Sequence, residues 1–203
     1  MKQNSKKLFI LQLHPSMIVT FLGILLGIIS LCFASLKDFK LALSFLTLAG
    51  ICDAFDGAFA NKFKRSNEDK LLGIQFDSLA DITISGFLPV CILISMGFNK
   101  FYNIIIYFLF IFAGIYRLAF FNIHASEDNK YFTGFPITLS TIVFPLLYLF
   151  TKMEIFFMTV MIILSILFIL NIKLKKPNLK LKIILSIIGI LIISYVIIMK
   201  VNL

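Results

Sequence analysis

The sequence predicts an all-α protein, a polytopic bundle of about seven transmembrane helices. The chain has 203 residues, of which 60% are hydrophobic, and a mean hydropathy of +1.02. Soluble domains are only about 45–50% apolar. Apolar runs long enough to cross a bilayer recur along the chain, and Lys and Arg cluster between them. We therefore expect residues 1–203 to form a single integral membrane domain.

The apolar runs define the expected spans, at about 20 residues per crossing. They are 16–36, 41–61, 71–98, 101–122, 134–151, 153–172 and 181–199. The fifth run is the shortest and contains Pro136 and Pro145. Before the first span, residues 8–11 follow Lys6 and Lys7 and indicate a short helix lying on the membrane surface. No small-residue cleavage site follows, so we expect no removable signal peptide.

The basic residues predict the orientation in a cell membrane. With the N-terminus in the cytoplasm, thirteen Lys and Arg lie in inner segments. Five lie in outer segments, namely Lys37, Lys40, Lys100, Lys152 and Lys200. The positive-inside rule therefore favours a cytoplasmic N-terminus. The net charge of +9 is divided among short clusters at the ends of spans, which is typical of topology signals and argues against nucleic-acid binding.

Four aspartates lie at helical spacing at the facing ends of the second and third spans. They occur in the patterns Asp53-x-x-Asp56-Gly57-x-x-Ala60 and Gly73-x-x-x-Asp77-x-x-x-Asp81. Positions three and four apart share a helix face, and the connecting loop turns the chain back. We therefore expect the carboxylates to meet at a common depth, about 7–15 Å below the loop.

Such a group of carboxylates needs compensating charge. Each carboxylate within a membrane costs about 2.5–3.5 kcal/mol on insertion scales, and divalent cations would supply the positive charge. A buried structural network or a cation pathway is the alternative. Gly57, Ala60 and Gly73 lack bulk on the same faces. They indicate either a notch for phosphates and a nucleotide or close packing of helices.

This pattern resembles the signature of the CDP-alcohol phosphatidyltransferases, D-x-x-D-G-x-x-A-R followed by G-x-x-x-D-x-x-x-D. One position departs from it: the usual Arg after the Ala is Asn61 here, so its role is either lost or taken over by Lys62 or Lys64. The resemblance implies a six-helix core plus one additional helix. It also implies transfer of a lipid phosphate from a CDP-linked lipid to an alcohol, release of CMP, and a homodimer.

The resemblance also implies roles for individual residues. Two divalent cations, Mg²⁺ or Mn²⁺, would be bound by Asp53, Asp56, Asp77 and Asp81. Asp81 would also be the general base that accepts the proton of the alcohol. The pocket for cytidine diphosphate would be lined by Gly57, Ala60 and Gly73. Thr20, on the first span, is either a nucleotide contact or an ordinary packing hydroxyl.

A second stretch bears on the acceptor alcohol. Residues 116–122 and 131–136 resemble the R-L-A-R-F-N and F-x-G-L-P segments of the phosphatidylserine synthase branch, except that Phe120 replaces the second Arg. Arg117 is expected to bind the serine carboxylate or a lipid phosphate, with Asn122 in the same pocket. Alternatively, Arg117 snorkels toward the membrane surface or pairs with an aspartate.

The expected function is metal-dependent transfer of a phosphatidyl group from a CDP-diacylglycerol-type lipid to L-serine at the cytoplasmic leaflet. The sequence leaves open whether the lipid tails are ester-linked or ether-linked. Glycerol 3-phosphate or inositol phosphate is the alternative acceptor, and either would favour further basic residues in the pocket. A cation transporter is the alternative of a different class, because it would also need coordinating carboxylates.

Overall fold

A computed structural model describes residues 14–124, 131–175 and 178–198. The α-helices are α1 (Ile18–Ser35), α2 (Phe39–Ala60), α3 (Asn67–Asp81), α4 (Leu88–Ser95), α5 (Phe101–Ile123), α6 (Ser140–Phe150), α7 (Glu154–Ile169) and α8 (Leu179–Ile198). A π-helical segment, Ile82–Phe87, joins α3 to α4. Short 3-10 turns, Pro15–Met17 and Ile137–Leu139, lead into α1 and α6. The strands are β1 (Tyr131–Thr133) and β2 (Lys173–Lys175).

The helices confirm the predicted membrane bundle. Five helical segments are long and apolar enough to cross a membrane: Pro15–Ser35, Phe39–Ala60, Asn67–Ser95, Phe101–Ile123 and Leu179–Ile198. Two shorter apolar segments, Ile137–Phe150 and Glu154–Ile169, complete the set. These seven segments coincide with the seven predicted spans. The predicted surface helix at residues 8–11 lies outside the described residues.

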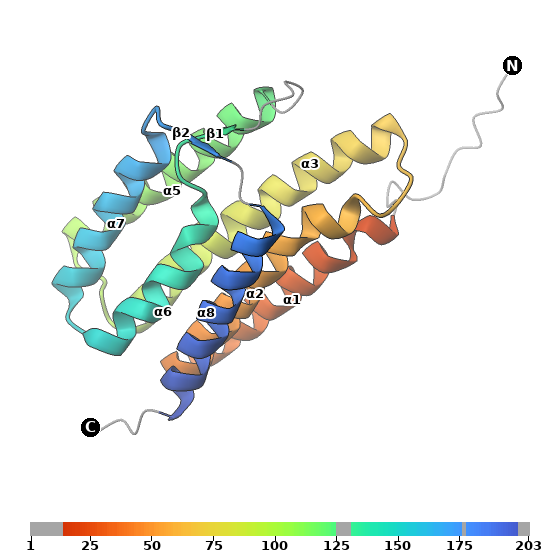
Figure 1. Cartoon of the computed structure of the whole chain (residues 1–203). Coiled ribbons are helices and arrows are strands. Elements are labelled where there is room, and N and C mark those ends of the chain that lie inside the picture. The colour runs from red at the N-terminus through yellow and green to blue at the C-terminus, as the bar shows by residue number, and fades with distance from the viewer. Residues whose placement is uncertain (1–13, 125–130, 176–177, 199–203) are drawn as a thin grey trace, which may run out of the picture.

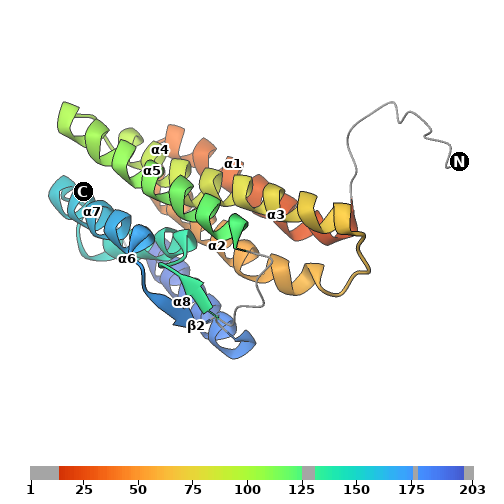
Figure 2. The ribbon, with the colours of Figure 1, turned by 90° about the horizontal axis from the view of Figure 1, so that it is seen from above.

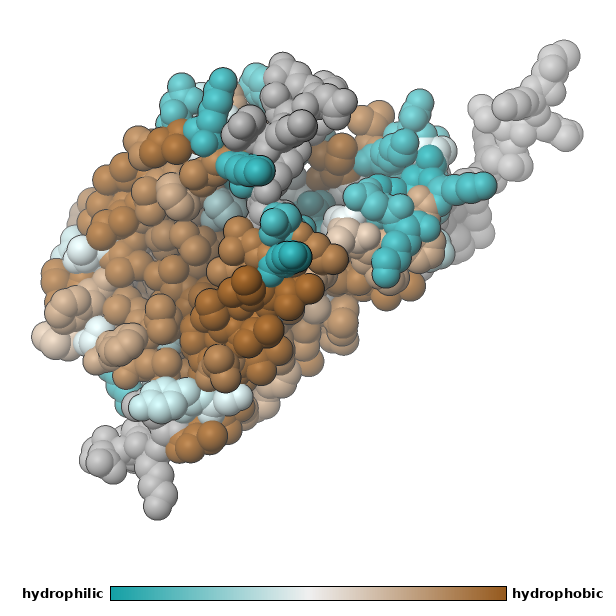
Figure 3. Space-filling view, in the orientation of Figure 1, coloured by the Kyte–Doolittle hydropathy of each residue, from teal (hydrophilic) through white to brown (hydrophobic). Residues whose placement is uncertain are grey.

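The helices form two groups with α6 between them. Helix α2 contacts α1 and α8 on one side of the bundle, and α5 contacts α7 on the other (Figures 1 and 2). The α2–α3 turn, the β1–β2 ribbon and the start of α8 lie toward the same end of the bundle (Figure 1). Apolar side chains cover the flanks, whereas polar residues gather toward that end (Figure 3). The described parts of the predicted inner segments that follow α2, α5 and α7 thus share one end of the molecule.

The core is built largely from aromatic side chains. Phe110, Phe144, Phe157 and Phe168 are almost completely buried, and their rings contact one another where α5, α6 and α7 meet. Aromatic rings bury large apolar areas and favour tilted contacts, so this cluster holds the second group of helices together.

Polar side chains determine where α2 and α3 begin. The Asp38 carboxylate accepts a hydrogen bond from the backbone N–H of Leu41 and caps α2. Ser66 and Asp69 form a reciprocal capping box that starts α3. Caps of this kind satisfy backbone donors that have no partner within the helix. Together they define where the two helices of the aspartate-bearing hairpin begin.

At the opposite end of the bundle, Glu154 connects α7 to α5. Its carboxylate accepts hydrogen bonds from Tyr102 Oη at 2.7 Å and Asn103 Nδ2 at 2.9 Å, and lies 3.1 Å from Lys100 Nζ. The Tyr102 hydroxyl and the Glu154 carboxylate raise the pKa of Lys100 above its usual value. Lys100 and Tyr102 are exposed, whereas Asn103 is buried, and we assign the group a role in joining the two helices.

The antiparallel β1–β2 ribbon was not predicted from the sequence. It pairs Tyr131 with Lys175 and Thr133 with Lys173. Gly134, which follows β1, has φ +74°, and a Cβ there would lie 2.3 Å from the carbonyl oxygen of Phe168. Only glycine fits both the backbone angle and this close approach. The ribbon therefore brings the chain after α5 against the C-terminal end of α7.

Candidate active site

The acidic side chains of α2 and α3 converge below the α2–α3 turn. Asp53, Asp56 and Asp77 each offer a carboxylate oxygen, and these oxygens all lie within 4.8 Å of one another. Asp56 is buried, and the other two are partly exposed. The helical spacing produces this arrangement, because Asp53 and Asp56 share a face of α2 that Asp77 meets from α3. Three closely spaced oxygen ligands suit a divalent cation.

Asp81 lies one turn further along α3 from Asp77. Its carboxyl group is within hydrogen-bond reach of Asp53, as that of Asp77 is of Asp56. The four aspartates therefore form two adjacent pairs across the hairpin. The positive charge of Arg117 on α5 acts on both Asp53 and Asp81. The acidic group thus has a guanidinium on the side facing α5.

Thr20 enters the same site from α1. Its hydroxyl donates a hydrogen bond to Asp56 Oδ2 at 3.3 Å. The other oxygen, Oδ1, accepts a hydrogen bond from the backbone N–H of Gly57. Both donors hold the Asp56 carboxylate in one orientation. The structure therefore places Thr20 beside the aspartates, whereas the sequence left open whether it is a nucleotide contact or a packing hydroxyl.

The small residues beside the aspartates border open space. Apart from its own helix, a Cβ added to Gly57 would meet no atom within 4 Å, and one added to Gly73 would meet Arg65 Nη1 at 3.6 Å. Ala60 is partly exposed one turn after Gly57. Small residues that serve helix packing bring a neighbouring helix into contact, and at Gly57 no neighbour is present. The notch interpretation is favoured over close packing.

Arg65 contacts Asn61, the position at which this chain departs from the family signature. Its Nη2 donates a hydrogen bond to Asn61 Oδ1 at 3.2 Å, and its Nη1 lies nearest to Gly73. Lys62 and Lys64, the candidates for the role of the missing Arg, are exposed. Arg65, four residues after Asn61, thus places a guanidinium beside Gly73, at the mouth of the notch.

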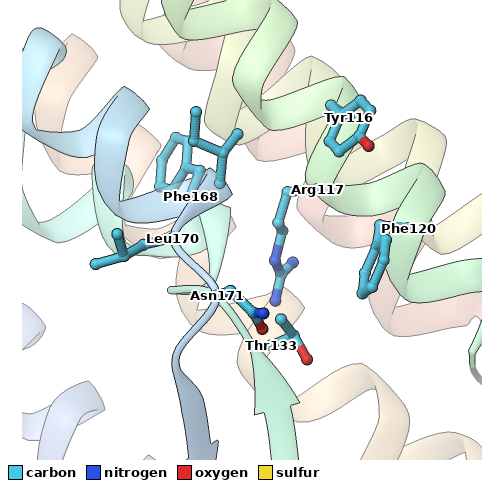
Figure 4. A pocket seen from close by; sticks show the side chains of 8 residues that line it. Tyr116, Arg117, Phe120, Thr133, Phe168, Leu170 and Asn171 are labelled. Atoms are coloured by element: carbon cyan, nitrogen blue, oxygen red, sulfur yellow. The ribbon is translucent and has the colours of Figure 1, made fainter.

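Arg117 also lines a cavity of about 240 Å³ between α5, the end of α7 and β1. Figure 4 shows its side chain extending from α5 toward Asn171 and Thr133. Arg117 is only 8% exposed. The remainder of the lining is formed by Tyr116, Phe120, Phe168, Ile169 and Leu170. A buried guanidinium among polar and aromatic side chains can bind a small anionic group.

Asn122 does not share this cavity with Arg117, contrary to expectation. Five residues along an α-helix correspond to a rotation of about 140° beyond a full turn, so the two side chains leave α5 in different directions. Asn122 Oδ1 instead accepts a hydrogen bond from Ser78 Oγ at 3.0 Å. Ser78 follows Asp77 on α3, so Asn122 joins α5 to the acidic helix.

Sequence reasoning missed three polar residues near these sites. Thr133 and Asn171 reach the Arg117 cavity through the β1–β2 ribbon, which had no sequence signal. Lys182 on α8 donates a hydrogen bond to the carbonyl of Ala54, next to Asp53. Its position inside the first turn of an apolar span was the signal available, since a charged residue there is usually functional.

Comparison with known proteins agrees with this geometry. Residues 13–201 match the family described as CDP-alcohol phosphatidyltransferase. Two Helicobacter pylori proteins, from strains 26695 and J99, are each 30% identical over 182 residues, which cover 84% of this chain and 74% of theirs. A Saccharomyces cerevisiae protein is 34% identical over 102 residues, covering 46% of this chain and 36% of the yeast protein.

All three relatives carry the name CDP-diacylglycerol–serine O-phosphatidyltransferase. The family match extends over every membrane segment and includes both acidic helices. The chain therefore belongs to the CDP-alcohol phosphatidyltransferase family of membrane enzymes.

Proposed function

We propose that this enzyme transfers the phosphatidyl group of a CDP-diacylglycerol-type lipid to the hydroxyl of L-serine and releases CMP. The observation that carries the proposal is the convergence of three carboxylates within 4.8 Å, with a buried Arg117 nearby. The names of the relatives favour serine as the acceptor.

The donor side of the site is formed by α1, α2 and α3. Asp53, Asp56 and Asp77 would hold a divalent cation, Mg²⁺ or Mn²⁺, with Asp81 completing the set, and the four carboxylates suit two ions. When bound, such ions neutralise the diphosphate and polarise the phosphorus under attack. The open space at Gly57, with Ala60 and Gly73 beside it, would admit the cytidine diphosphate. Thr20 positions Asp56 there through its hydrogen bond.

The reaction is a single displacement at the phosphorus that carries the lipid. The serine hydroxyl oxygen forms a bond to this phosphorus, and the bond from phosphorus to the CMP oxygen breaks. Asp81 accepts the hydroxyl proton, a role typically worth 10²- to 10⁴-fold in rate. Asp81 lies beside Asp53 and interacts electrostatically with the positive charge of Arg117. A carboxylate that stays ionised is a weak base, so its position contributes more than its basicity.

The acceptor side is the cavity around Arg117. A guanidinium binds a carboxylate through two parallel hydrogen bonds, which suits serine. Arg117 is the basic residue among the eight that line this cavity, whereas an acceptor with its own phosphate would favour several. This observation favours serine over glycerol 3-phosphate or inositol phosphate. The polar end of the bundle, which carries the basic turns, would face the cytoplasm.

The test offers purified protein CDP-diacylglycerol together with serine, glycerol 3-phosphate or inositol phosphate, and measures CMP release. Serine-selective release is expected, and it should stop when a chelator removes divalent cations. Release with another alcohol instead of serine would reassign the acceptor. Cation flux into liposomes without CMP release would point to the transporter.

Asp81 is tested by the substitution Asp81→Asn. We expect turnover to fall by about 10²- to 10⁴-fold. Binding of CDP, measured by calorimetry, should persist. The matched control is Glu68→Gln, which neutralises an exposed carboxylate on the same helix. Full activity of the Asp81→Asn enzyme would rule out its role as the base. A homodimer, expected from the family resemblance, is tested separately by light scattering of the purified enzyme.

A further inference from the structure

Helix α8 packs against the acidic helix α2 in an antiparallel direction. At Gly189 the two helices approach so closely that a Cβ would lie 3.1 Å from Thr47 Cγ2 and 3.3 Å from Ile51 Cδ1. Seven residues before Gly189 on α8 is Lys182, and seven residues after Thr47 on α2 is Ala54. Two helical turns take about seven residues, so the same register brings Lys182 to Ala54.

Lys182 completes this register with a direct contact. Its Nζ donates a hydrogen bond to the carbonyl oxygen of Ala54 at 2.7 Å. Ala54 follows Asp53 and precedes Asp56 by two residues, so the ammonium group lies at the edge of the acidic site. Its positive charge acts on Asp53 and on Asp77 across the hairpin. The side chain is half-buried.

A lysine in this position can do more than join two helices. An ammonium group has three donors, and the Ala54 carbonyl takes one of them. Lysine binds phosphate as a compact point charge. The open space at Gly57 begins on the same helix, three residues after Ala54. Arg117 lies on the other side of the aspartates, on α5. A diphosphate seated over the aspartates would therefore meet the Lys182 ammonium group from the α8 side, whereas Arg117, on the α5 side, belongs to the acceptor cavity.

We propose that Lys182 binds the diphosphate of the CDP-linked lipid, so that the last membrane helix contributes to the donor site. This inference rests on the proposed function, because it takes the nucleotide to lie over the aspartates. It assigns to α8 a role in substrate binding in addition to packing. The alternative is a purely structural role, in which Lys182 only ties α8 to α2.

Three substitutions separate the two roles. Lys182→Met keeps the apolar stem and removes the ammonium group. Lys182→Gln keeps a donor for the Ala54 carbonyl, one bond shorter, but removes the charge. Lys182→Arg keeps both a charge and a donor. The matched control is Lys180→Met, which removes an exposed lysine from the same turn of α8.

The measurements are kcat and KM for CDP-diacylglycerol and for serine, the affinity for CDP, and Tm. We expect Lys182→Met and Lys182→Gln to raise the KM for CDP-diacylglycerol and to weaken CDP binding about 10- to 100-fold. Tm and the KM for serine should stay near wild type with Lys182→Gln. Lys182→Arg should restore part of the CDP affinity, and Lys180→Met should behave as wild type.

The opposite pattern would overturn the inference. If Lys182→Gln binds CDP as the wild type does, the ammonium charge has no role in binding the donor. The same holds if Lys182→Met lowers Tm while the CDP affinity of the folded protein is unchanged. Both results are interpreted for a wild-type enzyme that releases CMP with serine, so they are distinct from failure of the proposed function, in which wild type releases no CMP with any alcohol.

Discussion

The open space beside Gly57 makes a substitution there informative. Gly57→Ala adds a methyl group that would meet no atom within 4 Å apart from its own turns of α2. Alanine is favoured over glycine in a helix by about 0.5–1 kcal/mol. For a chain of this length, that gain corresponds to a rise in Tm of about 1–4 °C. The fold should therefore become slightly more stable.

Activity should change in the opposite direction. If the donor nucleotide occupies this space, the methyl group crowds it, and overpacking costs about 1–3 kcal/mol. The expected loss in kcat/KM for CDP-diacylglycerol is about 5- to 150-fold. Thermal melting and steady-state kinetics on the same preparation measure both effects. Gly27→Ala, in α1, is the control, because that Cβ would make only ordinary contacts with Ile84 at 3.5 Å and Leu88 at 3.6 Å. A stabilised Gly57→Ala enzyme with unchanged kinetics would show that the nucleotide lies elsewhere.

Three further substitutions test other parts of the structure. Thr20→Val removes the hydroxyl that donates to Asp56, and we expect kcat/KM to fall about 3- to 10-fold with Tm unchanged; equal kinetics would make Thr20 a packing residue. Arg117→Lys loses the two-pronged contact, so the KM for serine should rise about tenfold while that for CDP-diacylglycerol stays constant; the reverse pattern would place Arg117 on the donor. Gly134→Ala forces a side chain against the Phe168 carbonyl at positive φ, at a cost of about 1–3 kcal/mol, and Tm should drop by about 2–12 °C; an unchanged Tm would contradict the close approach.

The sequence predicted most of the fold because hydropathy alone locates membrane helices. It also predicted the acidic hairpin, since Asp53, Asp56 and Asp77 are related by helical spacing and joined by a short turn. The β1–β2 ribbon was not predictable, because three-residue strands more than 35 residues apart carry no periodic signal. The site residues that lie within the hairpin could therefore be predicted from their spacing along the chain.

Contacts between helices that are distant in the sequence could not be predicted in this way. Lys182 was assigned to the positive charge of the inner face, and nothing in the sequence showed that α8 packs on α2. Asn122 was expected beside Arg117 because the two are near in sequence, but the helical rotation separates them. Arg65 took the place next to Asn61 because the turn folds back on the hairpin. These positions depend on tertiary packing.

The π-helical segment that begins directly after Asp81 has a consequence for how this enzyme tolerates change. Its wider turn accommodates one more residue than an α-helix would, so the faces of α3 and α4 are offset from each other. If the six residues Ile82–Phe87 wound as a regular α-helix instead, Asp77 and Asp81 would swing by about 100° relative to α4. Every acidic side chain would remain in the chain, yet they would no longer face α2. The direction in which the catalytic aspartates point thus depends on a segment that contributes no side chain to the reaction.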